Sequence, residues 1–306
     1  ITSWMAAHLP DLAVAEVFAE PGTQVCGTLS PGGTLLPSAD GSSSTLNGSW
    51  RFISGARSSR WQVVIAVMPV PGGEGMVPAI AAVPLHDLQV VDDWHTTGLC
   101  GTGSVTTAAR DVVVPAHRIL PLPPVLEGRG ACAEVGGDAR FGSPLVPTAS
   151  GLSAAVAPGV AAAALEQFRA RAADRGITYT DHERQDRAAV THLQVGEADL
   201  LVEESLFQAR SIADALDAHD GALGTWSVAE RAAARGRLGR TVELALGAAR
   251  LVGDAAGGSS VYLDAPVQRA VRDLQVMSQH ALISPATNRE LHGRVLCGLE
   301  PTTLYV

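Results

Sequence analysis

The sequence changes character near residue 150, and this change limits the folds that the chain can adopt. From about Val25 to Leu120, short β-rich runs such as WQVVIAVMPV and SVTTAARDVVVP alternate with clusters of Gly, Pro, Ser and Asn. Such alternation is typical of strands joined by turns. From Gly151 onward these clusters thin out and apolar residues recur at helical spacing. The sequence therefore predicts an all-β unit, a sandwich or a barrel, followed by a helical unit.

The second part of the chain predicts four long helices, at about 151–174, 185–218, 226–252 and 265–284. Four amphipathic helices with short connections form an antiparallel bundle. The segment before them is rich in Pro and Gly and has no strong period, which is typical of a crossover loop. The expected α+β organisation is a helical remnant at 1–20, a β domain at 21–122, the crossover loop at 123–150 and a four-helix bundle domain at 151–306.

The charge of the chain argues against a nucleic-acid partner. The formal net charge is −9 and all 22 basic residues are arginine, with no basic run that would neutralise a phosphate backbone. A membrane span needs about 18 or more apolar residues in succession. The most hydrophobic stretch, GLSAAVAPGVAAAALEQF, is alanine-rich and is broken by Pro158 and Gly159. We therefore expect neither a nucleic-acid surface nor a membrane span.

The cysteines give no sign of a metal site. Cys26, Cys100, Cys132 and Cys297 are widely scattered, with no CxxC pair and no histidine at zinc-finger spacing. The chain also lacks a P-loop, a GxGxxG turn between strand and helix, a GxSxG elbow and an HExxH pair. These observations favour a reduced, cytoplasmic setting and argue against a metal centre, a hydrolase and a classical dinucleotide fold.

Three local patterns resemble those of one family when they are combined with the order of a helical segment, a β unit and a helical bundle. They are LNGSWRFISGARSSRW (46–61), DDWHTTGLCGTGSVTTAARDVVVPAHRIL (92–120) and ARLVGDAAGGSSVYLDAPVQRAVRDLQVMSQHAL (249–282). Together they resemble the acyl-CoA dehydrogenase superfamily. More narrowly, they are similar to its flavin-dependent branch, the group D two-component monooxygenases. The likeness covers nearly the whole chain.

The resemblance implies an acyl-CoA dehydrogenase-like fold whose N-terminal helical domain is largely missing from this sequence, which begins at Ile1. The flavin would lie between the β domain and the bundle of a homo-oligomer, a dimer or a tetramer. Reduced FAD or FMN would come from a separate flavin reductase and would react with O2 to a C4a-hydroperoxyflavin. The oxygen would pass to a small aromatic, polyketide-like or amine substrate.

The resemblance also assigns cofactor contacts to the first half of the β domain. Trp50 and Ser54 belong to a W-x-x-x-S-G strand end, and Ser54 is the candidate for the contact to flavin N5 or O4. Leu29 and Ser30, in GTLSPGG, would present their backbone to the edge of the flavin ring. An ordinary hairpin with Ser and Gly at the turn is the alternative for each of these segments.

The segment DDWHTTGLCGTGS is expected to form a wall beside the flavin or the substrate. Trp94 would flank the ring, although taken alone it fits a core or interface aromatic equally well. Thr102 and Ser104 are the candidate substrate contacts, and capping of the turn is their alternative role. Cys100 stands where members of the family commonly have an arginine, which leaves the contact made by that arginine in doubt.

Three residues of the helical part are expected to approach the cofactor phosphates. Gly257 and Gly258 would allow a close backbone approach to a pyrophosphate, which the following helix N-terminus would favour. Arg175 matches the position from which the family sends an arginine toward the phosphates, and Arg171 is its neighbouring alternative. A plain loop between helices would also explain the glycines.

His280, in VMSQHAL, is the candidate catalytic residue. The resemblance places it on a late helix near flavin C4a, where it would hydrogen-bond the hydroperoxide or act as a base toward the substrate. A lone histidine on a helix is otherwise usually a structural group.

Two other functions are compatible with the sequence. One is α,β-dehydrogenation of an acyl thioester by a glutamate base, for which Glu197, Glu204 and Glu290 are the candidates. The late EGT signature of the dehydrogenases is absent, which favours oxygenation. The other is a redox-inactive homologue that uses the cleft for binding or for cyclisation.

Overall fold

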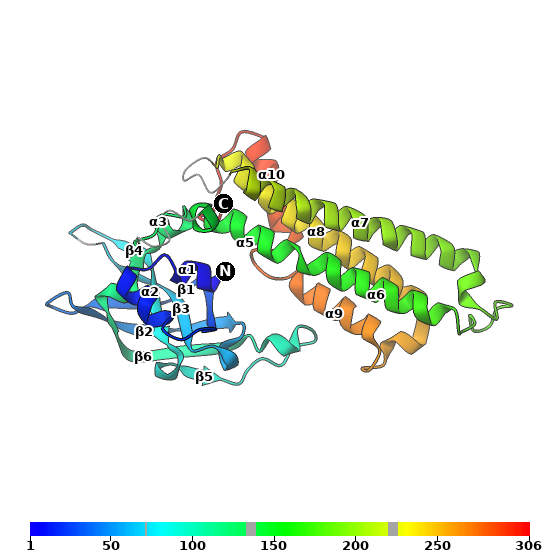
Figure 1. Ribbon diagram of the computed structural model, residues 1–306, viewed down its shortest axis with the longest axis horizontal. Helices are drawn as coiled ribbons and strands as arrows, with labels where there is room; N and C mark the ends of the chain where they lie inside the picture. Colours follow the sequence, from blue (N-terminus) through cyan, green and yellow to red (C-terminus); the bar gives the residue numbers. More distant parts are fainter. Residues whose placement is uncertain (71, 133–138, 220–225) are drawn as a thin grey trace. The chain divides into compact units, whose positions relative to one another are not determined.

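The computed structural model describes residues 1–70, 72–132, 139–219 and 226–306 (Figure 1). The chain divides into two compact units. Unit 1 comprises Ile1–Thr96, Cys100–Leu145 and His219–Trp226, and unit 2 comprises Thr97–Leu99, Val146–Ala218 and Ser227–Val306.

Unit 1 is built on a mixed seven-stranded sheet with the strand order β5-β6-β2-β1-β3-β4-β7. Strand β1 is antiparallel to β2 and parallel to β3, and the other neighbouring pairs are antiparallel. The strands are β1 (Val25–Pro37), β2 (Ser43–Ile53), β3 (Trp61–Pro69), β4 (Met76–Pro84), β5 (Gln89–Val91), β6 (Val105–Pro115) and β7 (Ile119–Pro121).

The core of unit 1 follows the two-residue period of the strands. Alternate residues such as Val64 and Ala66 of β3 and Ala79 and Ala81 of β4 are buried in one cluster. Trp50 of β2 belongs to this cluster and is 1% exposed. The β-rich, turn-separated runs of the sequence therefore fold into strands, and both faces of β3 and β4 are buried, as Val63 and Ile80 show.

Two short helices, α1 (Thr2–Ala6) and α2 (Asp11–Val17), occupy the segment that the sequence predicts to be a helical remnant. Glu16 of α2 accepts hydrogen bonds from Nε of Arg118 at 2.6 Å and pairs with Nε2 of His117 at 3.1 Å. Partial burial alone would raise the pKa of Glu16, but these two hydrogen bonds hold it below its ordinary value. The Arg118 guanidinium also lies 5.0 Å from the centre of the Trp61 ring, so one arginine links α2 to β3.

Unit 2 consists of helices, of which α8 (Val228–Ala255) contacts four others: α6 (Val156–Ala172), α7 (Ala189–Ala218), α9 (Pro266–Met277) and α10 (Pro285–Leu296). These long helices lie side by side (Figure 1). A capping box starts α8, because the Ser227 hydroxyl accepts the amide N–H of Glu230 and the Glu230 carboxylate accepts that of Ser227. Helices α6 to α9 correspond to the four expected ones.

The structure contains helices that the sequence analysis does not anticipate. Helix α10 follows the last expected helix, with Pro285 in its first turn, where proline is well tolerated. The segment 123–150, expected as a loop, holds α4 (Ala139–Gly142) and part of α3 (Leu122–Leu126) and α5 (Leu145–Ala154) among its described residues. Short glycine- and proline-containing helices lack the period that reveals longer ones.

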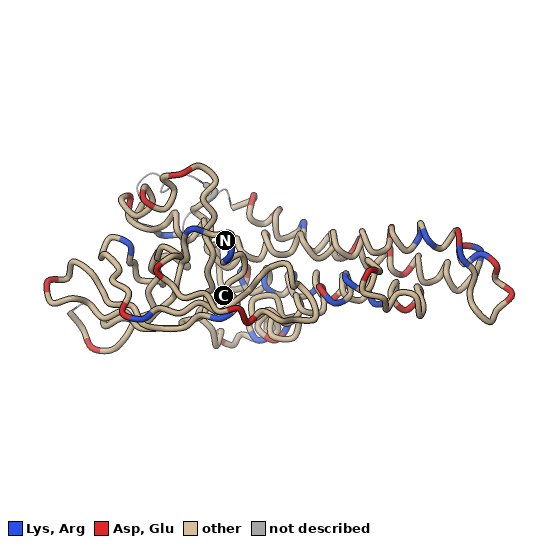
Figure 2. The backbone as a smooth tube through the Cα atoms, turned by 90° about the horizontal axis from the view of Figure 1, so that it is seen from below, with Lys and Arg blue, Asp and Glu red and all other residues tan. Residues whose placement is uncertain are grey.

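The stretch Leu145–Ala172 is long and apolar enough, by length and composition alone, to cross a membrane. This is weak support for a membrane span, because a helix in a protein core can have the same length and composition. Helix α6 packs against α7, α8 and α9. Along the described chain, acidic and basic residues are interspersed rather than gathered into one basic region (Figure 2).

Candidate functional site

A β-bulge interrupts β2 close to its end. Trp50 pairs with Thr107 and Ile53 pairs with Val105, so β2 has one more residue than β6 over this interval. Phe52 takes up the extra length with φ +64°, a left-handed conformation that a bulky residue rarely adopts. Trp50 shares the buried face of β2 with Leu46, and the bulge that follows turns Phe52 and Ser54 outward.

Three predicted residues come together where the bulge ends. The hydroxyl oxygen of Ser104 lies 2.7 Å from that of Ser54 and 2.7 Å from that of Thr102. Ser104 is buried, while Ser54 is exposed at the end of this hydroxyl chain. The amide N–H of Gly55, which has φ +75°, donates to the carbonyl of Thr102 at 2.8 Å and fixes the two segments together. These hydrogen bonds hold the Ser54 hydroxyl at an exposed position, where it is accessible to a ligand.

An exposed aromatic side chain lies beside the hydroxyl chain. Phe52 is 58% exposed and meets the half-buried Trp94 edge to face, with ring centres 6.2 Å apart. The Arg51 guanidinium lies 5.4 Å from the centre of the Phe52 ring. The left-handed backbone of Phe52 costs folding free energy and its exposed ring gains little from burial, so this corner offers a flat apolar surface to a ligand. Phe52 and Arg51 are absent from the sequence-based candidates.

The structure gives Trp50 a packing role instead of a ligand contact. Its indole N–H donates to the carbonyl of Ile65 at 2.8 Å. A Cβ on Gly32, Gly33 or Gly48 would lie 2.6, 2.8 and 3.0 Å from its ring atoms, so these glycines make room for the indole. The buried side chain of Trp50 therefore does not reach a surface on which a flavin could lie.

Leu29 and Ser30 lie within β1 and not in a loop. Leu29 is half-buried and Ser30 is exposed. The pairing of β1 with β3 shifts register between Gly27 and Pro31 and again between Pro31 and Thr34. The glycines of GTLSPGG thus serve this irregular strand and the packing of Trp50, and a flavin contact by Leu29 or Ser30 stays a prediction.

In unit 2 the structure brings Arg175 and Gly257 together, although they are far apart in sequence. Nη1 of Arg175 donates to the carbonyl of Ala256 at 3.0 Å and to the hydroxyl of Ser259 at 2.7 Å. Gly257 has φ +63°, and a Cβ there would lie 3.8 Å from Nη2 of Arg175. Gly258 follows in the same 3-10 turn, where a Cβ would meet nothing within 4 Å.

These contacts give Arg175 a structural role at the C-terminal end of α8. The last carbonyls of a helix lack internal partners. Arg175 satisfies that of Ala256, and Nε2 of Gln185 satisfies that of Ala255 at 2.8 Å. A cation at this end also interacts favourably with the helix dipole. Any contact of Arg175 with a phosphate would have to come in addition to this cap.

His280 lies in the turn after α9 and not on the helix where it is expected. Its Nδ1 accepts the amide N–H of Leu282 at 3.2 Å. A ring nitrogen that accepts carries no proton, so the neutral ring has its proton on Nε2. The residue is exposed by surface area, yet desolvation by the surrounding protein lowers the pKa of His280 below its ordinary value of 6.5. The neutral imidazole is thus the favoured form near pH 7.

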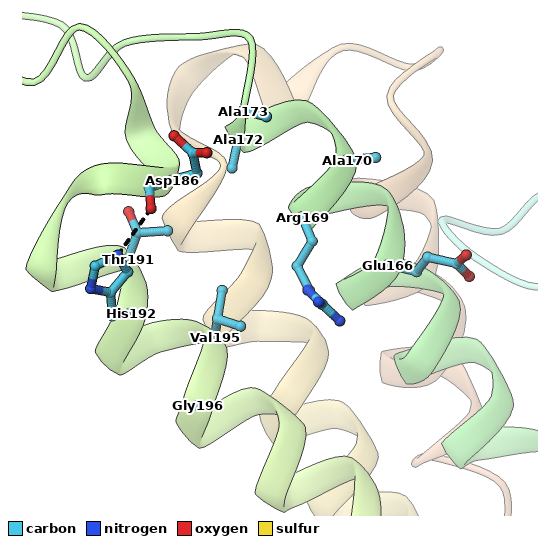
Figure 3. Close-up of a pocket in the computed structure, with 10 residues that line it drawn as sticks. All are labelled: Glu166, Arg169, Ala170, Ala172, Ala173, Asp186, Thr191, His192, Val195 and Gly196. Atoms are coloured by element: carbon cyan, nitrogen blue, oxygen red, sulfur yellow. Dashed lines mark hydrogen bonds between the residues drawn. The ribbon is translucent and has the colours of Figure 1, made fainter.

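A hollow in unit 2 contains none of these candidates. It measures about 810 Å³ and lies between α6 and α7 in unit 2 (Figure 3). Figure 3 shows Arg169 on α6 and His192 and Val195 on α7, with the His192 ring hydrogen-bonded to the carbonyl of Asp186. A second groove, of about 1090 Å³ in unit 1, is lined by Arg60, Trp61 and Arg118 among others and also lacks them. Within the described residues there is no cluster of potential metal ligands.

Comparison with known proteins reveals relatives over nearly the whole chain. Residues 152–285 match the family described as acyl-CoA dehydrogenase, C-terminal domain. The chain is 30% identical to the oxygenase component of an FADH(2)-dependent resorcinol hydroxylase from Rhizobium sp. (strain MTP-10005), over 99% of this chain and 76% of the relative. It is 27% identical to a pigment production hydroxylase from Rhodococcus sp. (strain ATCC 21145), over 95% of this chain and 74% of that protein.

Solved structures of flavin-dependent enzymes have a similar fold. XiaF from Streptomyces sp., in complex with FADH2 and glycerol, is 27% identical and superposes with a TM-score of 0.88, covering 98% of this chain and 75% of that one. The HsaA monooxygenase from M. tuberculosis superposes with a TM-score of 0.86 at 22% identity, over 99% and 77% of the two chains. At that identity the second likeness is evidence for the fold alone.

Proposed function

The chain belongs to the acyl-CoA dehydrogenase superfamily, and within it to the flavin-dependent two-component monooxygenases, and from this premise we propose that it hydroxylates a small phenolic or related aromatic substrate. Its cofactor is reduced FAD or FMN, and the electrons would come from a partner flavin reductase. In the balanced reaction one atom of O2 enters a C–H bond of the substrate, the other leaves as water, and the reduced flavin gives up two electrons. When bound, the reduced flavin supplies the activation of O2.

One observation carries this proposal: the hydroxyl chain of Ser54, Ser104 and Thr102 ends at a surface flanked by exposed Phe52. A flavin needs a hydrogen-bonding group near N5 and O4 and a flat apolar surface against its ring. We propose that Ser54 provides the first and Phe52, backed by Trp94, provides the second. The bulge of β2 fits this use, because it places Ser54 and Phe52 on the same outward side.

We propose that His280 acts through its Nε2–H. Because Nδ1 accepts the Leu282 amide, the neutral ring can donate a hydrogen bond but has no free lone pair for taking a proton from the substrate. This favours the first of the two expected roles, hydrogen bonding to the reacting oxygen, over the role of a base. Donation there would stabilise negative charge as the O–O bond breaks.

The structure does not favour dehydrogenation of an acyl thioester. That reaction needs a carboxylate base with a raised pKa, typically one that is partly buried. Glu290 pairs with Arg294 at 2.8 Å, Glu204 lies 3.9 Å from Arg240, and Glu197 is exposed. All three carboxylates are exposed.

The experiment is a hydroxylation assay with reduced flavin generated by a flavin reductase, under 18O2, with resorcinol as the first of a panel of phenols. The proposal predicts a product that carries one atom of 18O and appears only with reduced flavin. Products free of 18O, or no product across the panel together with reduction of oxidised flavin by an acyl-CoA, would overturn it.

A further inference from the structure

A chain of hydrogen bonds runs from the interior of unit 2 to His280. Nε of Arg235, in α8, donates to Oδ1 of Asn288, in α10, at 2.7 Å, and Nη1 of Arg235 donates to the carbonyl of Tyr305. Nδ2 of Asn288 donates to the carbonyl of Leu282 at 2.9 Å. The amide N–H of Leu282 in turn donates to Nδ1 of His280 at 3.2 Å. Three segments of the sequence are thereby linked to one imidazole ring.

The packing of α10 on α8 makes this chain possible. A Cβ on Gly239 of α8 would lie 3.0 Å from Cβ of Asn288 and 3.1 Å from Cα of Pro285. Glycine therefore lets α10 approach α8 closely at the start of α10, directly after the turn that carries His280. Asn288 is 0% exposed and Leu282 is 7% exposed, so the middle of the chain is shielded from water.

Arg235 is a buried cation without an anionic partner among the described residues. It is 6% exposed, and desolvation lowers its pKa to about 10. Burial of such a charge is destabilising, and an apolar side chain of similar volume would fold at least as well. Both of its acceptors are neutral, so ion pairing does not offset this cost. The guanidinium instead orients the side-chain amide of Asn288. Its N–H group donates to the amide oxygen, so the amide NH2 group faces the carbonyl of Leu282.

We propose that Arg235 and Asn288 are positioning residues for His280. Arg235 orients the amide of Asn288, Asn288 holds the backbone of the turn at Leu282, and the Leu282 amide keeps the proton of His280 on Nε2. A histidine tautomer is set by the hydrogen bond at its other nitrogen, here Nδ1. The catalytic consequence rests on the proposed function, in which Nε2–H bonds the reacting oxygen.

The test is 15N NMR of the histidine side chains in the full chain labelled with 15N-histidine, with the His280 signals assigned by their loss in His280→Gln. We expect the wild type to show an Nε2–H ring at His280. Asn288→Asp keeps an acceptor for Arg235 but removes the donor to Leu282, and it is expected to raise the share of the Nδ1–H tautomer. Substrate hydroxylation should fall about tenfold at saturating reduced flavin.

Leu291→Ala is the matched control, because Leu291 lies in α10, is 4% exposed and takes no part in the chain. This variant should lower the melting temperature and leave the His280 tautomer unchanged. If Asn288→Asp does not fold, Arg235→Lys, which keeps the charge but loses the planar donor fork, gives the same readout.

The proposal is overturned if the His280 signals of Asn288→Asp match the wild type, or if Leu291→Ala changes them equally. Because the NMR readout needs no flavin, it is independent of the proposed function. Failure of the wild type to bind reduced flavin would remove the proposed function and leave the tautomer result standing.

Discussion

The hydroxyl oxygens of Ser54 and Ser104 lie 2.7 Å apart, although the residues are separated by 50 positions in the sequence. The contact joins the end of β2 to the segment that leads into β6, where the bulge at Phe52 shifts the register. It leaves the Ser54 hydroxyl exposed and oriented by a buried partner, a geometry suited to hydrogen bonding with a ligand.

Ser104→Ala should weaken the binding of reduced flavin with little effect on folding. The substitution removes the partner that orients Ser54, and a hydrogen bond of this kind contributes about 0.5–1.5 kcal/mol, or roughly 2–10-fold in affinity. Anaerobic fluorescence titration measures the change. Ser49→Ala, at an exposed position of β2, is the control and should bind like the wild type. Equal affinity in all three proteins would refute the role of the hydroxyl chain.

Phe52→Gly should separate stability from binding. Glycine adopts positive φ without strain, so relief of the conformation at φ +64° is expected to raise the free energy of unfolding by about 1 kcal/mol. Loss of the exposed ring should at the same time weaken reduced-flavin binding. Urea unfolding and flavin titration measure the two effects. A destabilised variant with normal flavin affinity would show that Phe52 is needed for packing against Trp94 instead.

Trp50→Ala should lower the free energy of unfolding and leave the affinity for reduced flavin unchanged. The indole is fully buried against three glycines and its N–H is bonded to Ile65, so truncation is expected to cost about 3–5 kcal/mol. Chemical unfolding gives this figure, and flavin affinity should be normal for the fraction that remains folded. Unchanged stability with lost flavin binding would restore the role that the sequence analysis gives to Trp50.

The hydroxylation rate should fall as the pH drops through the pKa of His280, which lies below 6.5 in the folded protein. Protonation of Nδ1 would break the bond from the Leu282 amide, so the neutral form is the active one. His280→Asn should remove this acidic limb and slow the reaction at all pH values. His192→Gln is the control, because His192 lies in the separate hollow between α6 and α7. If the rate of His280→Asn still falls at acidic pH, the titrating group is not His280 and the prediction is wrong.

The pH dependence of stability has a definite sign. Because the folded state lowers the pKa of His280, the unfolded chain binds its proton more readily. The contribution of this residue to stability is therefore present above pH 6.5, the ordinary value, and decreases as the pH falls from there to the lower pKa of the folded state.

Much of the secondary structure can be predicted from the sequence, because the spacing of apolar residues indicates which face of a helix or strand is buried. The alternating runs of unit 1 and the helical spacing of α6 to α9 predict the element types. The resemblance to the family assigns roles to Ser54, Thr102 and Ser104, and the structure adds that they form one hydrogen-bonded chain.

Trp50 and Ser54, which the sequence analysis places together, face opposite ways in the structure. In a regular strand, residues four positions apart share a face, so Trp50 and Ser54 should point the same way. Leu46 and Trp50 lie on the buried face of β2, and the extra residue at Phe52 reverses the alternation beyond Trp50, so that Ser54 faces outward. A positive φ at a phenylalanine has no sequence signature, which explains why Phe52 is missed.

Roles that depend on contacts between distant segments cannot be predicted from the local sequence either. Nothing near Arg175 indicates that it caps α8, some 80 residues later in the chain, and nothing near Asn288 indicates that it bonds the turn after α9. Both depend on how helices approach each other, and that approach is controlled by glycines such as Gly239 whose neighbours appear only in three dimensions.

The central claim is tested most directly by anaerobic titration of the protein with reduced FAD and reduced FMN, followed by mixing with oxygenated buffer in a stopped-flow spectrophotometer. The account predicts binding of at least one reduced flavin and a transient flavin–oxygen absorbance that decays more slowly than free reduced flavin oxidises, with faster decay in His280→Asn. No binding of either flavin, or oxidation at the rate of the free cofactor, would contradict it.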